Sequence, residues 1–235
     1  MEVLGLPIEV VHKDIKNLHV GVYPPGGRVR VAAPLRLDED AVRLAIISRL
    51  GWIRRQQARF AQQARQSQRE LAYGESHYFE GRRYRLKLVE QDAAPRVRLA
   101  TNSLIELRIP SGTGRADRES MLHQWYRERI CEQIPALLRK WQPRIGVEVE
   151  EVRIRRMKTR WGSCNGPARR VWLNLELAKK PASCLEYILV HEMVHIRERH
   201  HNRRFRQLMD AAMPSWQLCR DELNCAPLAH EEWQY

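Results

Sequence analysis

The chain has 235 residues, of which 43% are hydrophobic and 29% charged, with 12 Gly and 12 Pro. This length exceeds one compact domain of common size, so we expect one domain with an appended part, and the composition excludes disordered and fibrous classes. Basic residues exceed acidic residues by 13, with +8 over 1–115 and +5 over 116–235. Because the positive charge is spread over both halves, it is as consistent with a soluble basic surface as with weak, salt-sensitive attraction to nucleic acid.

The cysteines and the start of the chain bear on the cellular compartment. Five cysteines form no CxxC pair and are odd in number, and no basic stretch followed by an apolar run opens the sequence. A cytoplasmic location fits this cysteine usage best. No apolar run approaches the roughly 20 residues that cross a bilayer, so we expect no membrane partner.

The first half of the chain shows strand patterns around one helix pattern. Segments 18–23 and 28–33 alternate around a Pro-Pro-Gly-Gly turn and predict a hairpin. Asp38 is placed to cap a helix from about 39 through the sixties, whose Arg- and Gln-rich end favours a solvated face over a nucleic-acid contact. Further strands are predicted over 77–90, 95–100 and 103–109.

A Ser-Gly-Thr-Gly segment at 111–114 then resembles a linker. We therefore place one domain over 1–112 and a second over 113–235. The predicted fold class is α+β, with a β-rich N-terminal part that contains a long helix, followed by a zincin-like catalytic domain. That domain would contain a backing helix, a small antiparallel sheet and a helix with the metal motif.

The second half begins with the backing helix, predicted from about 116 to 142 by apolar residues at helical spacing. A strand near 152–154 and a return strand over 171–177 flank the turn chemistry of Asn165-Gly166-Pro167. The return strand is either an exposed edge that an extended polypeptide could join or simply a structural strand.

The clearest chemical motif is HEMVH at residues 191–195, on an apolar helix that residues 183–186 would open as a capping box. Residues four apart share a helix face, so His191 and His195 can bind one metal ion with Glu192 beside it. Each histidine alone could be an ordinary core residue. The strands before the helix and the further histidines after it favour a metal site.

A zinc site that keeps one position for water needs a third protein ligand. Glu198 would lie about 10.5 Å along the same helix from His191, which is too far for convergence. His201 has the spacing of the metzincin motif, and it requires the helix to end near 198–200 so that the chain can turn back. His200 stays possible on spacing.

Four motifs carry a resemblance that extends over nearly the whole chain. They are KTRWGSC at 158–164, LNLEL at 173–177, YILVHEMVH at 187–195, and His201 followed by Phe205, with N-terminal matches in the 18–33 hairpin, Trp52-Ile53 and the aromatic positions of 78–84. These residues resemble the YgjP-like metallopeptidase family, which is related to the SprT-like and WLM zinc peptidases. The resemblance implies that zinc is bound by His191, His195 and His201, with Glu192 as the catalytic residue.

Two positions depart from the family pattern. His200 stands where an Asn is usual before the third ligand, and Arg206 stands where a Trp is often found after the Phe. The first departure keeps His200 open as a ligand, and the second should affect packing only.

The expected reaction is hydrolysis of a peptide bond, in which zinc acidifies water and Glu192 takes its proton and returns it to the leaving amine. Cys164 is expected to be an unreactive thiol. Candidate contacts to the transition state or substrate are Arg160, Ser163, Asn174 and Tyr187, with simple packing as the alternative for Tyr187.

Two other functions remain open from the sequence. One is a metal-dependent hydrolase of nucleotides or other phosphate compounds, although no Gly-rich phosphate loop is visible. The other is a DNA-associated protease or nucleic-acid-binding module with conditional activity, suggested by the net charge and the Arg/Gln-rich helix. A polypeptide substrate is the leading partner, and the sequence predicts no oligomeric state.

Overall fold

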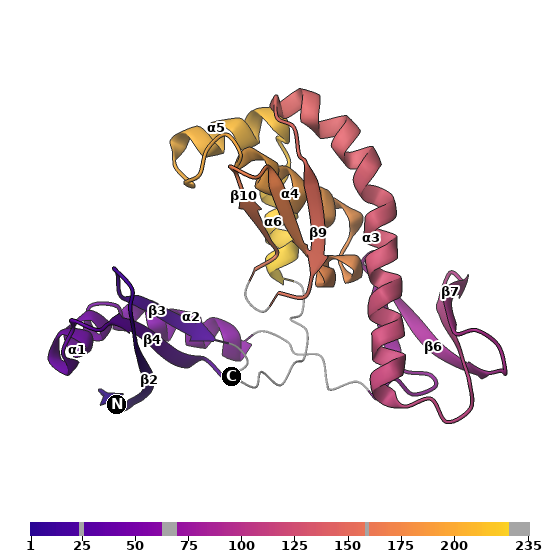
Figure 1. Cartoon of the computed structure of the whole chain (residues 1–235), viewed down its shortest axis with the longest axis horizontal. Coiled ribbons are helices and arrows are strands. Elements are labelled where there is room, and N and C mark those ends of the chain that lie inside the picture. The colour runs from indigo at the N-terminus through magenta and orange to yellow at the C-terminus, as the bar shows by residue number, and fades with distance from the viewer. Residues whose placement is uncertain (24–25, 63–69, 158–159, 226–235) are drawn as a thin grey trace. The chain divides into compact units, whose positions relative to one another are not determined.

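The structure, a computed structural model, describes residues 1–23, 26–62, 70–157 and 160–225. These residues form an α+β protein, as the sequence predicts, and they fall into a compact unit before residue 63 and another from 70 to 225 (Figure 1). Each unit has an apolar core of its own.

The first unit pairs a four-stranded sheet with two helices. Its elements are β1 (Glu2–Val3), β2 (Leu6–Lys13), β3 (His19–Tyr23), β4 (Arg28–Pro34), α1 (Glu39–Ile47) and α2 (Leu50–Gln62). The strand order is β1-β2-β4-β3, and the antiparallel β3–β4 pair confirms the predicted hairpin. Pro24 and Pro25 of its turn lie outside the described residues.

The helix predicted from 39 onward is two helices. Asp38 caps α1 as expected, because its Oδ1 accepts a hydrogen bond of 2.8 Å from the Ala41 N–H. The break follows α1, where the Arg49 N–H donates to the Ile46 carbonyl three residues back and tightens the last turn. Part of the predicted Arg/Gln-rich end, residues 63–69, lies outside the described residues.

The second unit contains two sheets around a long helix. Its elements are β5 (Ser76–Phe79), β6 (Arg82–Glu90), β7 (Arg96–Thr101), β8 (Leu104–Ile109), α3 (Arg115–Ile145), β9 (Glu151–Arg155), β10 (Gly162–Asn165), β11 (Arg170–Asn174), the 3-10 helix η1 (Leu175–Lys179), α4 (Ala182–Val194), α5 (Arg203–Ala212) and α6 (Trp216–Cys225). The apolar residues predicted along α3 are buried or packed against the core of this unit.

The predicted boundary near residue 112 differs from this division into units. The sheet β5-β6-β8-β7 shares its core with α3: the Phe79 and Trp125 rings lie 4.8 Å apart, and the Tyr126 hydroxyl donates to the Tyr78 carbonyl. Because this sheet buries a face against α3, the Ser-Gly-Thr-Gly segment is a turn inside one unit, and the division falls between residues 62 and 70.

The three-stranded sheet beside α4 corrects two expectations. Its order is β10-β11-β9, with β10 antiparallel and β9 parallel to β11, so the sheet is mixed rather than antiparallel. The strand predicted over 171–177 ends at Asn174, whose Oδ1 accepts from the Glu176 N–H and caps the 3-10 helix that follows. Since β11 is the central strand, the predicted polypeptide-binding edge is wrong there, and β10 holds an edge of the sheet.

Helix α4 begins without the predicted capping box. Pro181 occupies the N-cap position, and no side chain caps the helix. The Ser183 hydroxyl donates instead to Glu222 on α6, and the Glu186 carboxylate accepts from the Trp141 indole on α3. These side chains therefore hold α4 against α6 and α3 instead of capping its N-terminus, since tertiary contacts can override a local sequence preference.

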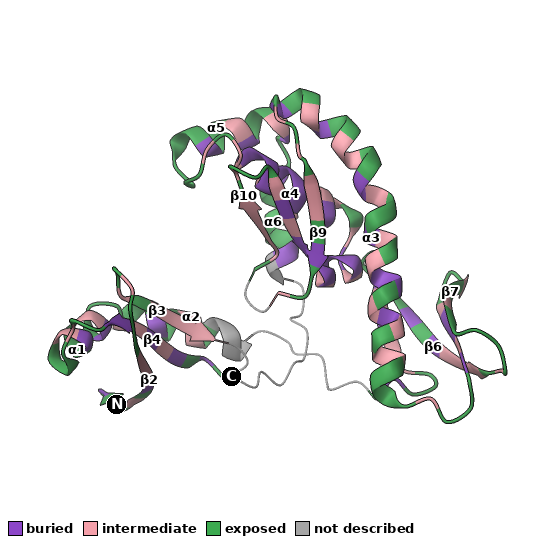
Figure 2. Ribbon diagram, viewed as in Figure 1, coloured by how far each residue is buried: buried purple, intermediate pink, exposed green. Residues whose placement is uncertain are grey.

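Almost every face of α4 is buried (Figure 2). Val171 and Leu173 of β11 are fully buried in the same core, so the sheet covers one side of the helix, and α3, α5 and α6 also contact it. No helix of the described part of the chain combines the length and apolar character needed to cross a membrane. The four cysteines whose side chains are described are free thiols.

Candidate metal centre

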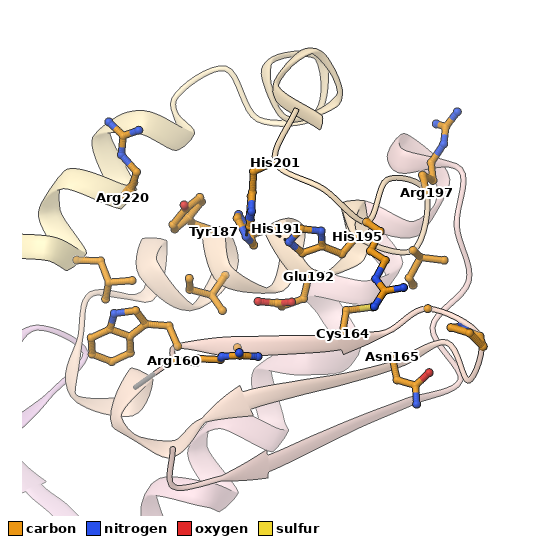
Figure 3. Close-up of a pocket in the computed structure, with 18 residues that line it drawn as sticks. Arg160, Cys164, Asn165, Tyr187, His191, Glu192, His195, Arg197, His201 and Arg220 are labelled. Atoms are coloured by element: carbon orange, nitrogen blue, oxygen red, sulfur yellow. Dashed lines mark hydrogen bonds between the residues drawn. The ribbon is translucent and has the colours of Figure 1, made fainter. Parts of the chain in front are cut away.

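Three imidazoles from α4 and the segment after it converge on one point (Figure 3). The Nε2 atom of His201 lies 3.0 Å from that of His191 and 3.1 Å from that of His195. His200 is outside this group, and its backbone N–H donates to the Glu198 carboxylate. The structure therefore brings together His191, His195 and His201 of the candidate ligands, in a cluster that could hold a metal ion.

A short helix and an immediate turn produce this convergence. Helix α4 ends at Val194, earlier than the predicted 198–200, and the Arg197 N–H then donates to the Val194 carbonyl three residues back. The Arg197 guanidinium donates to the Ile145 carbonyl at the end of α3 and fixes the turn. Asn202 starts α5 by accepting from the Phe205 N–H at 2.9 Å, which sets the position of His201 just before it.

The donor chemistry of this cluster fits a metal cation. The His195 Nδ1 lies 3.0 Å from the Glu198 carbonyl, and a carbonyl only accepts, so Nδ1 carries the proton and Nε2 is left with a free lone pair. Nitrogens with free lone pairs at such short separations repel one another unless a cation lies between them. The Phe205 ring packs against all three imidazoles with centroid separations of 4.6 to 4.9 Å and holds their orientation.

Burial keeps the histidines of α4 uncharged. Loss of solvation, together with the neighbouring imidazoles, lowers the pKa of His191 to about 3. Burial also lowers the pKa of His195, against the opposing effect of the Glu198 carbonyl. Neutral imidazole is the form that binds metal, so at neutral pH these side chains need no deprotonation before binding.

Glu192 lies between the histidines and β10 (Figure 3). Only 5% of the residue is exposed, and this burial raises the pKa of its carboxyl to about 8, while the Arg160 charge acts in the opposite direction. A Cβ atom at Gly162 would lie 2.6 Å from the Glu192 Oε1 and 2.9 Å from the Ile188 Cγ2. The absence of a side chain at Gly162 therefore makes room for the carboxylate, a role that the sequence does not reveal.

The histidines line an open pocket of about 1170 Å³. Of the four predicted contacts, Arg160 and Tyr187 line it, whereas Ser163 and Asn174 do not. The Asn174 amide donates to the Met157 and Arg160 carbonyls, each at 2.8 Å, and so holds the loop before β10 instead of facing the pocket. Lys158 and Thr159 of the same loop lie outside the described residues.

Two residues that line the pocket, Tyr187 and Cys164, have ionisable groups that stay protonated at neutral pH. Burial raises the pKa of Tyr187 to about 12, and its ring stacks on Trp216 at 6.3 Å and meets His191 edge-on at 5.8 Å. Burial, with the nearby Glu192 charge, raises the pKa of Cys164 to about 11. A protonated thiol is a poor nucleophile and a poor metal ligand, which agrees with the unreactive role expected for Cys164.

This geometry agrees with what comparison with known proteins finds. A family model described as YgjP-like, metallopeptidase domain, matches residues 16–226. The chain belongs to the YgjP-like family. The resemblance inferred from the motifs is thereby confirmed, and the protein is a metallopeptidase, an activity that implies a metal cofactor and polypeptide substrates.

Comparisons with solved structures and with curated proteins add little to this family assignment. The crystal structure of the metallopeptidase zymogen of Pyrococcus abyssi abylysin is similar over 38% of this chain and 90% of that one, with 20% sequence identity and a TM-score of 0.36. No protein in the curated set matches the chain.

The pocket of this YgjP-like enzyme also contains arginines that the sequence reasoning missed. Arg197 and Arg199 follow the metal motif directly, and Arg220 comes from α6. The pair at 197 and 199 was visible as positive charge close to the histidines. Arg220 had no local signal, because only the packing of α6 beside α4 brings it to the pocket.

Proposed function

We propose that this YgjP-like enzyme is a zinc peptidase of zincin-like architecture in which His191, His195 and His201 hold the metal. The observation that carries the proposal is that the His201 Nε2 lies within 3.1 Å of the Nε2 atoms of both His191 and His195, beside a buried carboxylate. Imidazole donors suit zinc, and three protein ligands leave a fourth position for water or substrate.

Glu192 is the proposed proton carrier. When bound, zinc supplies Lewis-acid chemistry, which polarises the scissile carbonyl and makes water more acidic. The Glu192 carboxylate accepts the proton of the attacking water and delivers it to the nitrogen of the leaving amine. Its burial favours the protonated form, and this makes the carboxylate a stronger base than an exposed glutamate.

Tyr187 is the proposed contact to the developing negative charge of the carbonyl oxygen, and Arg160 is a proposed contact to the substrate. Both line the pocket, and both can donate hydrogen bonds at neutral pH, the Arg160 guanidinium as a cation and the Tyr187 phenol as a neutral donor. Ser163 and Asn174 have no part in this proposal because they lie outside the pocket.

A polypeptide substrate would bind along β10, not along the strand predicted at 171–177. β10 is at an edge of its sheet, and Gly162, Cys164 and Asn165 of this strand line the pocket. An extended chain that added to this edge by backbone hydrogen bonds would pass beside Glu192. The two alternatives from the sequence, nucleotide hydrolysis and nucleic-acid binding, stay predictions.

Metal analysis of two histidine variants tests the ligand set. We expect His201→Ala to lose zinc and His200→Ala to keep it, because only His201 faces the other two imidazoles. The adjacent substitutions remove the same side chain, so a general effect on folding would appear in both variants. Retention of zinc by His201→Ala, or its loss from His200→Ala alone, would contradict the proposed ligand set.

A further inference from the structure

Most of the charged side chains that line the proposed active site are basic. Arg160, Arg197, Arg199 and Arg220 line the pocket, and Glu192 is the only carboxylate among the described residues that line it. Arg220 and Arg197 lie on opposite sides of the histidines, and Arg160 lies beside Glu192 on the β10 side (Figure 3). A substrate bound at the histidines would therefore have positive charge on several sides.

The arginines differ in how far the protein already occupies their hydrogen-bond donors. Arg197 donates to the Ile145 carbonyl, and Arg220 pairs with Asp221 at 2.9 Å. Arg160 and Arg199 are exposed, and their guanidinium groups make no hydrogen bond or ion pair with any residue in the described ranges. Each guanidinium offers five donors, so Arg160 and Arg199 are the most available for an external anion.

We propose that this pocket selects polypeptides with Asp or Glu side chains next to the scissile bond, and that Arg160 and Arg199 bind those carboxylates. The inference rests on the proposed function, because the pocket and the reacting centre are taken to be the same place. Guanidinium groups bind carboxylates through paired hydrogen bonds, so charge and geometry both favour an acidic substrate. The same charges would repel a basic segment and thereby add selectivity.

The geometry of the pocket favours an acidic polypeptide over a nucleotide as the bound anion. An extended acidic polypeptide uses both the arginines and the free edge of β10, whose residues line the same pocket. A nucleotide would use the charge only. The polypeptide is therefore the ligand that the described contacts favour, and a nucleotide becomes an outcome of the test.

The test compares two fluorescent peptides of equal length that differ only in Glu or Gln at the two positions beside the central bond. Fluorescence anisotropy measures their binding to the zinc-loaded full chain with Glu192→Gln, which we expect to hydrolyse them slowly, and the variants below are made in that background. The variants are Arg160→Gln/Arg199→Gln and, as a control of similar exposure outside the pocket, Arg203→Gln. Cleavage of both peptides by the zinc-loaded protein is followed separately by mass spectrometry.

We expect the Glu peptide to bind about tenfold more tightly than the Gln peptide, as two charge-assisted contacts permit. The double variant should reduce this preference to within about twofold, and Arg203→Gln should leave it unchanged. Equal binding of both peptides overturns the inference. So does an equal loss in Arg203→Gln, because the effect would then come from overall charge.

The remaining outcomes separate this inference from the proposed function. If the preference is present but neither peptide is cleaved, the peptidase proposal fails and the acidic selection stands. If both peptides are bound and cleaved equally, the peptidase proposal stands and the acidic selection fails. Displacement of the Glu peptide by a nucleoside triphosphate that the zinc-loaded protein hydrolyses, with both peptides left intact, overturns both.

Discussion

The position of the Glu192 carboxylate depends on a neighbour that has no side chain. In Gly162→Ala, the new Cβ would lie 2.6 Å from the Glu192 Oε1, so the carboxylate has to move. Displacement of a reacting group by about 1 Å costs up to about 100-fold in rate. We expect this variant to lose roughly 10- to 100-fold in kcat for peptide hydrolysis while its zinc content, measured by metal analysis, is unchanged.

A second glycine of the same hairpin provides the control. A Cβ at Gly166 would lie 3.8 Å from the His195 carbonyl, which is an ordinary contact, so Gly166→Ala should keep nearly the activity of the unmodified protein. Full activity in Gly162→Ala would show that the carboxylate does not need this space. Loss of zinc in the same variant would show that the damage reaches the histidines.

At the scale of residues, the sequence predicts best where one helix sets the geometry. His191, His195 and Glu192 follow from helical spacing alone, and the cluster contains both histidines. The sequence suggests Ser163 and Asn174 because they are polar and close to the motif, but the direction of a side chain on or after a strand depends on the pairing of that strand. Arg220 reaches the pocket through tertiary packing, which leaves no trace in local sequence.

At the scale of elements, the N-cap of α5 connects helix stability with the metal centre. The Asn202 Oδ1 accepts from the Phe205 N–H at 2.9 Å, and His201 directly precedes this cap. Asn202→Ala should lower the free energy of unfolding by about 1 kcal/mol. It should also weaken zinc binding, measured by competition with a chelator, because His201 and Phe205 lose a fixed position.

The cap of α1 separates these two effects. The Asp38 Oδ1 accepts from the Ala41 N–H at 2.8 Å in the other unit, so Asp38→Ala should cost a similar free energy without changing the affinity for zinc. If Asn202→Ala binds zinc as tightly as Asp38→Ala, the cap has no role in placing the ligand.

The sheet of β5 to β8 contains a carboxylate that should make stability depend on pH. Glu106 is buried and accepts from Arg108 and Arg98, at 2.6 and 2.9 Å, and these hydrogen bonds lower its pKa from 4.5 to about 2. A lowered pKa in the folded state stabilises the protein above the unfolded value, and this stabilisation is lost as the pH falls from about 4.5 to about 2.

Urea unfolding across that pH range checks this dependence. Glu106→Gln should be less stable at pH 7 and should lose part of the decline in stability below pH 4.5. Glu132, which pairs with Arg129 on an exposed face, is the control, and Glu132→Gln should change stability little. An unchanged decline below pH 4.5 in Glu106→Gln would assign the effect to other carboxylates.

Local sequence patterns predict helices, strands and caps correctly where no tertiary contact favours a different local structure. The hairpin of β3 and β4 and the cap at Asp38 follow the sequence because both depend on neighbouring residues only. The alternation over 171–177 misled because Leu175 and Leu177 are buried in a 3-10 helix as fully as they would be in a strand. Residues 183–186 have the letters of a capping box, yet their side chains bind other helices.

At the scale of the whole molecule, the α+β class and the presence of two parts follow from the sequence, but the division between the parts does not. Gly-rich composition at 111–114 suggests a linker, whereas the burial of β5 to β8 against α3 joins the segments on either side of it. Which strands share a core with which helix depends on long-range packing, and a single sequence does not encode that in any local pattern.

At the centre of the proposed function, His191, His195 and His201 hold zinc while Glu192 moves the proton. The most direct test measures zinc content and peptide hydrolysis in the unmodified protein and in Glu192→Gln. We predict that both bind zinc equally and that the variant hydrolyses peptides about 10²- to 10⁴-fold more slowly, the usual contribution of a general base. Undiminished hydrolysis by zinc-loaded Glu192→Gln would contradict the proposed role of Glu192.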